Sequence, residues 1–181
     1  MTQPPTQAVL FGAEEPQIPP DDVGYRGTIA CAAVGISYRQ LDYWARTGLV
    51  VPSVRGAKGS GTQRLYSFRD VLVLKVVKRL LDTGVSLHNI RVAVELLRVR
   101  GVADLTNITL LSDGSSVYEC TSQDEIIDLL AGGQAVFGIA VGRVVREIEG
   151  ELATLPSERA DAAASASDDE LAVRRRRRST A

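Results

Sequence analysis

Apolar residues recur at intervals of three and four positions along much of the chain between residues 28 and 155, a period typical of amphipathic helices. Shorter runs rich in Val, Ile and Leu, bounded by Gly, Ser and Asp, favour β-strands instead. The pattern predicts helices over residues 28–34, 37–47, 67–83, 86–100, 122–131 and 141–155. It predicts short strands over residues 51–55, 63–66, 108–111, 117–120 and 134–140. The expected fold class is mainly α with a small amount of β.

The best-marked helix start lies at Ser37, which follows a turn that Gly35 permits. Ser37 and Gln40 have the spacing of a capping box, in which each side chain binds the other residue's backbone N–H. Leu41 and Trp44 fall on one side of this helix and are expected to face the core. Gly48 is expected to end the helix in a left-handed conformation.

The outer face of this helix combines aromatic, basic and amide side chains. The residues expected to face outward are Tyr38, Arg39, Gln40, Asp42 and Arg46. The short helix over residues 28–34 and the turn at Gly35 precede it, which completes a helix-turn-helix pattern. In this pattern the second helix enters the major groove, where its first turn meets base edges and phosphates. The sequence therefore predicts a recognition helix for double-stranded DNA, with Tyr38 and Gln40 reading bases and Arg39 contacting phosphate.

The next segment has the composition of a β-hairpin with a glycine-rich loop. Residues 51–55 and 63–66 read as strands, and the loop between them contains Gly at three positions. Arg55, Lys58 and Arg64 give this segment positive charge and no negative charge. We expect a wing whose backbone and cations approach the phosphates of DNA. The alternative is an exposed hairpin with solvated charges.

Residues 26–100 resemble the winged helix-turn-helix domain of the MerR family of bacterial transcription regulators. The matching residues are Gly35, Ile36, Ser37, Arg39, Leu41, Tyr43, Trp44, Gly48, Leu49, Val50, Pro52, Arg64, Tyr66, Ser67, Asp70, Val71, Gly84, Val85, Ser86, Leu87 and Ile90. The resemblance implies that Tyr43 presents its hydroxyl to the DNA backbone, whereas Trp44 is structural. The residues expected to contact DNA are Tyr38, Arg39, Gln40, Tyr43, Arg46, Arg55, Lys58, Arg64 and Tyr66.

Charge and composition divide the chain into four parts. Residues 25–100 contain 13 Lys and Arg against 4 Asp and Glu, whereas residues 101–155 contain 2 against 9. We expect a DNA-binding domain over residues 25–101 and a small acidic domain over residues 102–155. Residues 1–24 and 156–181 are rich in Pro, or in Ala and Ser, and are expected to be disordered.

The acidic domain departs from the resemblance. MerR regulators usually continue into a long helix that forms an antiparallel coiled coil, but Asp113 and Gly114 between β-prone runs indicate a hairpin instead. The predicted order is β-β-α-β-α. About 50 residues bury little core alone, so we expect the sheet or the final helix to make a homodimer, which would match a palindromic site. Effector binding is the competing use of this domain.

Two terminal motifs leave a second function open. Residues 7–11, Gln-Ala-Val-Leu-Phe, resemble peptides that dock on the bacterial sliding clamp, and residues 174–178 are five consecutive arginines. The alternative function is therefore an architectural or replication-associated DNA-binding protein that docks partners through these segments. The family's usual mechanism, which realigns an overlong promoter for RNA polymerase, adds RNA polymerase as a further candidate partner by resemblance.

Other classes of function lack their motifs. The chain contains no G-x-S-x-G, Walker or H-E-x-x-H motif, and we expect no enzyme activity and no cofactor. Its two cysteines are far apart, and one histidine without a cluster of ligands is not a metal site. No run of about 18 residues is apolar and uncharged, so we expect a cytoplasmic protein at the nucleoid and no membrane contact.

Overall fold

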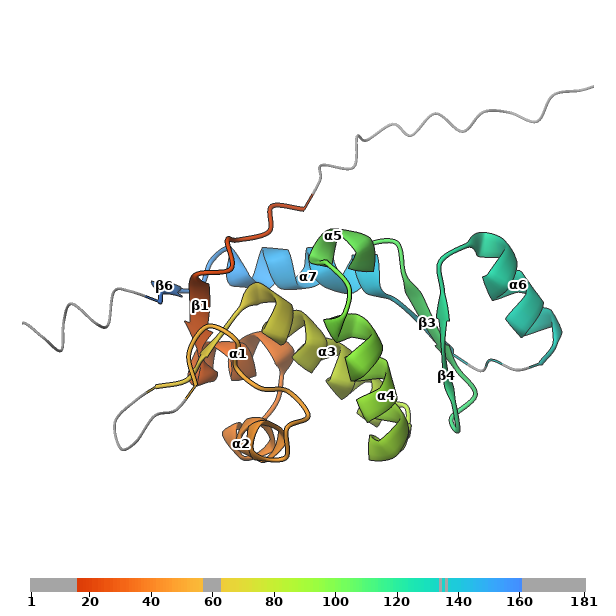
Figure 1. Cartoon of the computed structure of the whole chain (residues 1–181), viewed down its shortest axis with the longest axis horizontal. Coiled ribbons are helices and arrows are strands. Elements are labelled where there is room, and N and C mark those ends of the chain that lie inside the picture. Colours follow the sequence, from red (N-terminus) through yellow and green to blue (C-terminus); the bar gives the residue numbers. More distant parts are fainter. Residues whose placement is uncertain (1–15, 57–62, 134, 136, 161–181) are drawn as a thin grey trace, which may run out of the picture.

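The computed structural model describes residues 16–56, 63–133, 135 and 137–160, and it is mainly helical with two small antiparallel sheets (Figure 1). The helices are α1 Gly27–Val34, α2 Tyr38–Arg46, α3 Phe68–Asp82, α4 Leu87–Arg98, α5 Val102–Leu105, α6 Gln123–Ala131 and α7 Val141–Leu152. The strands are β1 Val23–Arg26, β2 Leu65–Tyr66, β3 Thr109–Ser112, β4 Val117–Cys120, β5 Phe137–Ala140 and β6 Glu158–Arg159.

Side-chain caps start the helices where the sequence predicts them. Ser37 accepts a hydrogen bond from the N–H of Gln40, and the Gln40 side chain accepts one from the N–H of Ser37, which confirms the capping box at α2. The same reciprocal arrangement begins α3 at Ser67 and α6 at Ser122, and Ser86 caps α4. Local sequence therefore determines these four starts.

A left-handed glycine separates α1 from α2, and another follows α2. Gly35 has a φ of 76° and Gly48 a φ of 71°, a region that other residues rarely adopt. The N–H of Gly35 donates to the carbonyl of Cys31 at 2.9 Å, so the glycine closes α1 while turning the chain into α2. These two turns confirm the predicted ends of both helices.

Each sheet has three strands. The first has the order β2-β1-β6, with Tyr25 opposite Tyr66 and Val23 opposite Arg159. The second has the order β4-β3-β5, and Gly114, with a φ of 88°, lies in the turn between β3 and β4. The first sheet therefore joins segments from the two ends of the described chain, whereas the second is built within one short stretch.

The first sheet corrects the predicted ends of the folded region. Composition predicts disorder for residues 1–24 and 156–181, but Val23 lies in β1 and Glu158 lies in β6. The first helix begins after Arg26 and not at Thr28. Strand pairing between distant segments explains the difference, because neither segment has a composition that predicts order by itself. Residues 1–15 and 161–181, with the Gln-Ala-Val-Leu-Phe motif and the five arginines, lie outside the described residues.

The predicted hairpin of the wing is only partly formed in the described residues. Arg55 and Leu65 make an isolated bridge, and β2 pairs with β1 instead of with residues 51–55. Pro52 has no N–H, and the N–H of Ser53 donates to the Asp70 carboxylate at 2.7 Å, so these positions cannot form a regular ladder. Residues 57–62, which include the predicted loop cation Lys58, lie outside the described part of the chain.

Helix α3 lies at the centre of the core. Its apolar residues Val71, Leu72, Leu74, Val76 and Val77 are fully buried. Helix α7 packs along α3, and its own buried residues belong to the same continuous hydrophobic core (Figure 1). The apolar face of the final helix, which the sequence suggests as a surface for a second chain, is therefore already covered within one chain.

Ion pairs hold α7 to α3 beside this core. Lys75 lies 3.1 Å from the Glu147 carboxylate and 3.2 Å from that of Glu151, and Arg79 also pairs with Glu147. Burial raises the pKa of Glu147, but the hydrogen bond from Lys75 and the charges of Arg79 and Lys75 together hold it below its usual range. The acidic surface of α7 is thus used in part to bind the basic surface of α3.

Candidate nucleic-acid interface

Helix α2 separates a buried face from an exposed one. Leu41 and Trp44 are 1% and 3% exposed, which confirms their predicted place in the core. On the opposite side, Tyr38 is 59% exposed and Tyr43 is 47% exposed. Arg39 is exposed as well and makes no ion pair with the described residues. The outer face therefore offers a cation and two aromatic hydroxyls to a partner.

The side chain of Gln40 has a structural role in addition to any role in recognition. Its Oε1 accepts from the N–H of Ser37 and from the Ser37 hydroxyl, each at 3.0 Å. This uses the acceptor of the amide and leaves the two N–H donors of the group for a base edge. If Gln40 reads a base, it does so as a donor.

Asp42 connects α2 to β2, the strand that follows the predicted wing. Its Oδ1 accepts from Arg64 at 2.8 Å, and its Oδ2 lies 2.9 Å from Arg46 one helical turn later. The hydrogen bond from Arg64 holds the pKa of Asp42 below its usual range. The carboxylate therefore stays ionised and holds two of the predicted DNA-contacting arginines next to the outer face of α2.

Arg55 is also held by acidic and carbonyl oxygens. Its Nε donates to the carbonyl of Gln63 at 3.2 Å, and its guanidinium lies 3.7 Å from Glu158 in β6. Arg26 pairs with the same carboxylate. Glu158 therefore neutralises part of the positive charge that the sequence pattern assigns to the wing. No local pattern indicates this pair, because its two residues lie far apart along the chain.

Tyr66 is predicted from the sequence to contact DNA, but in the structure it lies in the core. Its side chain is fully buried in the core, and its hydroxyl finds no hydrogen-bond partner among the described residues. Burial raises the pKa of Tyr66 to about 12. A side chain with no exposed surface cannot touch DNA, so Tyr66 is a core residue and the prediction of a direct contact is wrong.

Arginines from α4 support the end of α2. Arg91 donates to the carbonyl of Thr47 at 3.2 Å, and Arg98 donates to the carbonyls of Gly48 at 3.2 Å and Leu49 at 2.9 Å. The last carbonyls of a helix have no partner within the helix, and cationic donors there also complement its dipole. Sequence reasoning missed these contacts because no local pattern reports which distant arginine reaches a helix end.

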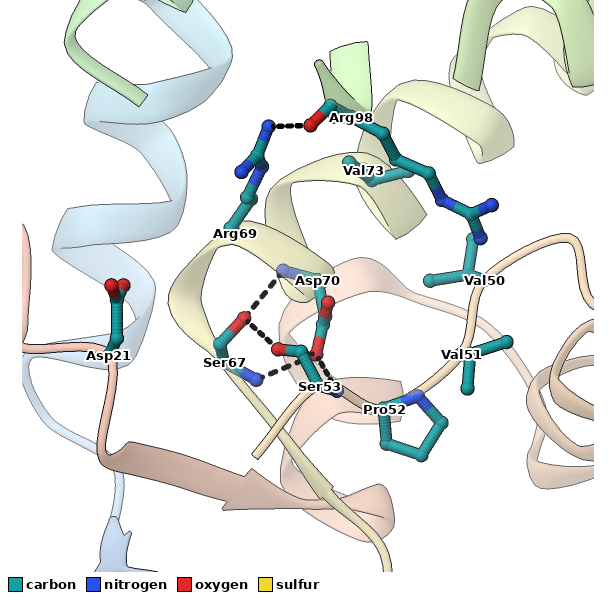
Figure 2. A pocket seen from close by; sticks show the side chains of 10 residues that line it. All are labelled: Asp21, Val50, Val51, Pro52, Ser53, Ser67, Arg69, Asp70, Val73 and Arg98. Atoms are coloured by element: carbon teal, nitrogen blue, oxygen red, sulfur yellow. Dashed lines mark hydrogen bonds between the residues drawn. The ribbon is translucent and has the colours of Figure 1, made fainter. Parts of the chain in front are cut away.

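A polar network fixes the segment between α2 and the predicted wing. Figure 2 shows Ser53, Ser67 and Asp70 pointing toward one another at the edge of a cavity of about 550 Å³. Asp70 accepts from the N–H and the hydroxyl of Ser53 at 2.7 and 2.8 Å, and from the N–H of Ser67 at 2.9 Å. Since Asp70 also completes the capping box with Ser67 at the start of α3, one carboxylate sets both the start of that helix and the path of the chain toward the predicted wing.

The described residues show no alternative site for a metal or a reactive thiol. No three His, Cys, Asp or Glu side chains in this part of the chain gather as a metal ion would require. Burial raises the pKa of both Cys31 and Cys120, which disfavours the reactive thiolate form. No described helix combines the length and the apolar character needed to cross a bilayer.

The geometry around α2 defines a class of protein. Two short helices meet at a left-handed glycine, and the second presents basic and aromatic side chains outward from a fixed core, as in helix-turn-helix DNA-binding proteins.

Comparison with known proteins agrees with this class. Residues 25–97 match the protein family described as MerR HTH family regulatory protein. Proteins named as HTH-type transcriptional regulators in Mycobacterium bovis and in two strains of Mycobacterium tuberculosis are 64% identical to this chain over 179 residues. The similarity covers 94% of this chain and 80% of each relative. The chain belongs to the MerR family of helix-turn-helix transcriptional regulators.

Proposed function

We propose that this regulator binds a palindromic promoter site as a homodimer, with α2 of each copy in the major groove of one half-site. The observation that carries the proposal is the exposed face of α2, where Tyr38, Arg39 and Tyr43 project from a helix whose other face is locked into the core. Exposed aromatic and cationic groups on a rigid helix are suited to contact bases and phosphates without reorganising the fold.

The individual roles follow from chemistry and position. Tyr38 and the amide donors of Gln40 lie in the first turn of α2, which is the part of a recognition helix that meets base edges. Arg39 supplies a cation with no competing ion pair in the described residues, so we assign it a phosphate contact. Tyr43 would donate its hydroxyl to the DNA backbone.

Arg46 and Arg64 have a different place in the proposal because Asp42 binds both. Each guanidinium retains donors that the single carboxylate does not use, and the pairing holds them at the rim of α2. We assign them phosphate contacts in a fixed geometry. Arg55, which pairs with Glu158, is the weakest of the predicted contacts, and Lys58 remains a sequence-based expectation outside the described residues.

Selection of binding sites from a random duplex library tests this function directly. The full-length protein should enrich an inverted repeat whose half-sites are centred about 10 base pairs apart, or a multiple of that distance. A single half-site would contradict the dimeric mode, and the absence of any motif would contradict sequence-specific regulation. The second result would instead favour the architectural function, in which DNA is bound without preference for promoters.

A further inference from the structure

The outer edge of β5 is unpaired among the described strands. In the order β4-β3-β5, β5 pairs with β3 on one side, and no other described strand pairs with it. The N–H of Val141 donates to the carbonyl of Ile108 at 2.9 Å, in register with the pairs of β3 and β5. Backbone groups of a strand point alternately to either side, so those of Gly138 and Ala140 point away from β3.

A groove lies beside β5. It has a volume of about 730 Å³ and is lined by the four residues of β5 together with residues of α3 and α7. The charged residues that line it are Arg79, Asp82, Arg143 and Glu147. Arg79 pairs with Glu147 and Asp82 pairs with Lys78 within the chain, so most of this charge is already neutralised and does not select a strongly acidic or strongly basic partner. A strand edge with little free charge beside it suits a partner that pairs through its backbone, as an identical strand does.

We propose that the occupant of this groove is β5 of a second copy of the chain, paired antiparallel so that the two three-stranded sheets become one. Antiparallel pairing of identical edge strands produces the two-fold symmetry that a palindromic site requires. The inference therefore rests on the homodimer of the proposed function and specifies its interface. It also accounts for dimerisation without α7, whose apolar face is covered by α3.

Ala140 offers a substitution that separates the strand edge from the fold. Its φ of −72° matches the value that proline imposes, and Ile139 before it lies in a strand, as the residue before proline prefers. Its N–H points away from β3, so Ala140→Pro removes no hydrogen bond within one chain. In the proposed dimer it removes one donor from each copy and adds bulk at the edge.

Sedimentation equilibrium of the full chain tests the interface. Wild-type protein should be a dimer, and Ala140→Pro should weaken dimerisation by about 10- to 100-fold, the effect of removing two backbone hydrogen bonds. At concentrations where both proteins are monomeric, the circular dichroism spectrum and the thermal midpoint of Ala140→Pro should match those of wild type. The matched control is Leu130→Lys on α6, whose side chain is 52% exposed and lies outside the groove, and this variant should remain dimeric.

The outcomes separate this interface from the function on which it rests. Equal dimerisation of Ala140→Pro and wild type would overturn the β5 interface while leaving DNA binding intact. Loss of the dimer in Leu130→Lys alone would overturn it in favour of α6. If Ala140→Pro is a folded monomer, it should bind a single half-site as tightly as the wild-type protein does. Only the additional affinity that wild type gains from a second half-site should disappear.

Discussion

Gly142 provides a sharp test of how α7 packs against the segment that follows α5. A Cβ atom added at this position would lie 2.2 Å from the carbonyl oxygen of Thr106, far inside van der Waals contact, and Gly142 is buried. The neighbouring atoms are backbone, so they cannot move aside as a flexible side chain would. Gly142→Ala must therefore shift α7 away from the segment after α5 or distort that segment.

The expected cost is that of overpacking a core, about 1 to 3 kcal/mol. For a chain of this size each kcal/mol lowers the melting temperature by about 2 to 4 °C, so Gly142→Ala should lower it by about 2 to 12 °C. The matched control is Gly150→Ala in the same helix, where an added Cβ meets nothing within 4 Å. There the helix propensity of alanine should stabilise the protein by about 0.5 to 1 kcal/mol.

Differential scanning calorimetry of the two variants measures both effects. Because α7 and α3 share one hydrophobic core, Gly142→Ala should lower the temperature of a single transition. A separate, low-temperature transition in this variant, with the remainder of the protein unchanged, would show that residues 102–155 form an independent domain. An unchanged midpoint would mean that α7 does not approach Thr106 as closely as the structure shows.

Three further predictions concern the interface and the charges around it. Trp44→Ala should destabilise the protein by about 3 to 5 kcal/mol, as removal of a buried aromatic side chain does. Tyr43→Phe should keep the melting temperature and reduce operator affinity. Equal destabilisation by both substitutions would mean that α2 is rotated from its described position. Asp42→Asn should strengthen binding to nonspecific DNA because it removes a negative charge from the rim of α2. It should also release Arg64, so the protein should discriminate less between operator and random sequence. Unchanged binding to both kinds of DNA would argue against an interface at this rim. The pKa of Glu147 is lowered in the folded protein, so its contribution to stability is present above the ordinary glutamate range near pH 4.3 and is lost as pH falls through the folded value. The free energy of unfolding in urea should therefore fall less for Glu147→Gln than for wild type between about pH 5 and pH 3.

The features that the sequence predicts correctly are local ones. The capping pairs Ser37 with Gln40 and Ser67 with Asp70 need only residues three positions apart, so the pattern of the chain is sufficient to locate α2 and α3. Trp44 can be assigned to the core from helical spacing alone. The short strands β3 and β4 are marked by the turn at Asp113 and Gly114.

The features that the sequence does not predict depend on contacts between distant residues. Strand β1 pairs at once with β2 and β6, and neither Val23 nor Glu158 carries a local sign of this. The sequence pattern places Tyr66 among the DNA contacts, although its position in the sheet buries it. The ion pair of Arg64 with Asp42 likewise joins residues 22 positions apart, and only the fold brings them together.

The most direct test of the central claim, that the outer face of α2 binds DNA, is the salt dependence of operator binding by Arg39→Ala. Fluorescence anisotropy between about 50 and 200 mM salt should give a weaker affinity and a slope shallower by about 0.9 for each phosphate that the variant no longer neutralises, or about 1.8 for a dimer. Arg146→Ala is the matched control, because Arg146 is an exposed arginine on α7 rather than on α2. Its affinity and slope should equal those of wild type. Equal slopes for Arg39→Ala and wild type would contradict the claim, and an effect of Arg146→Ala alone would place the DNA on the other side of the molecule.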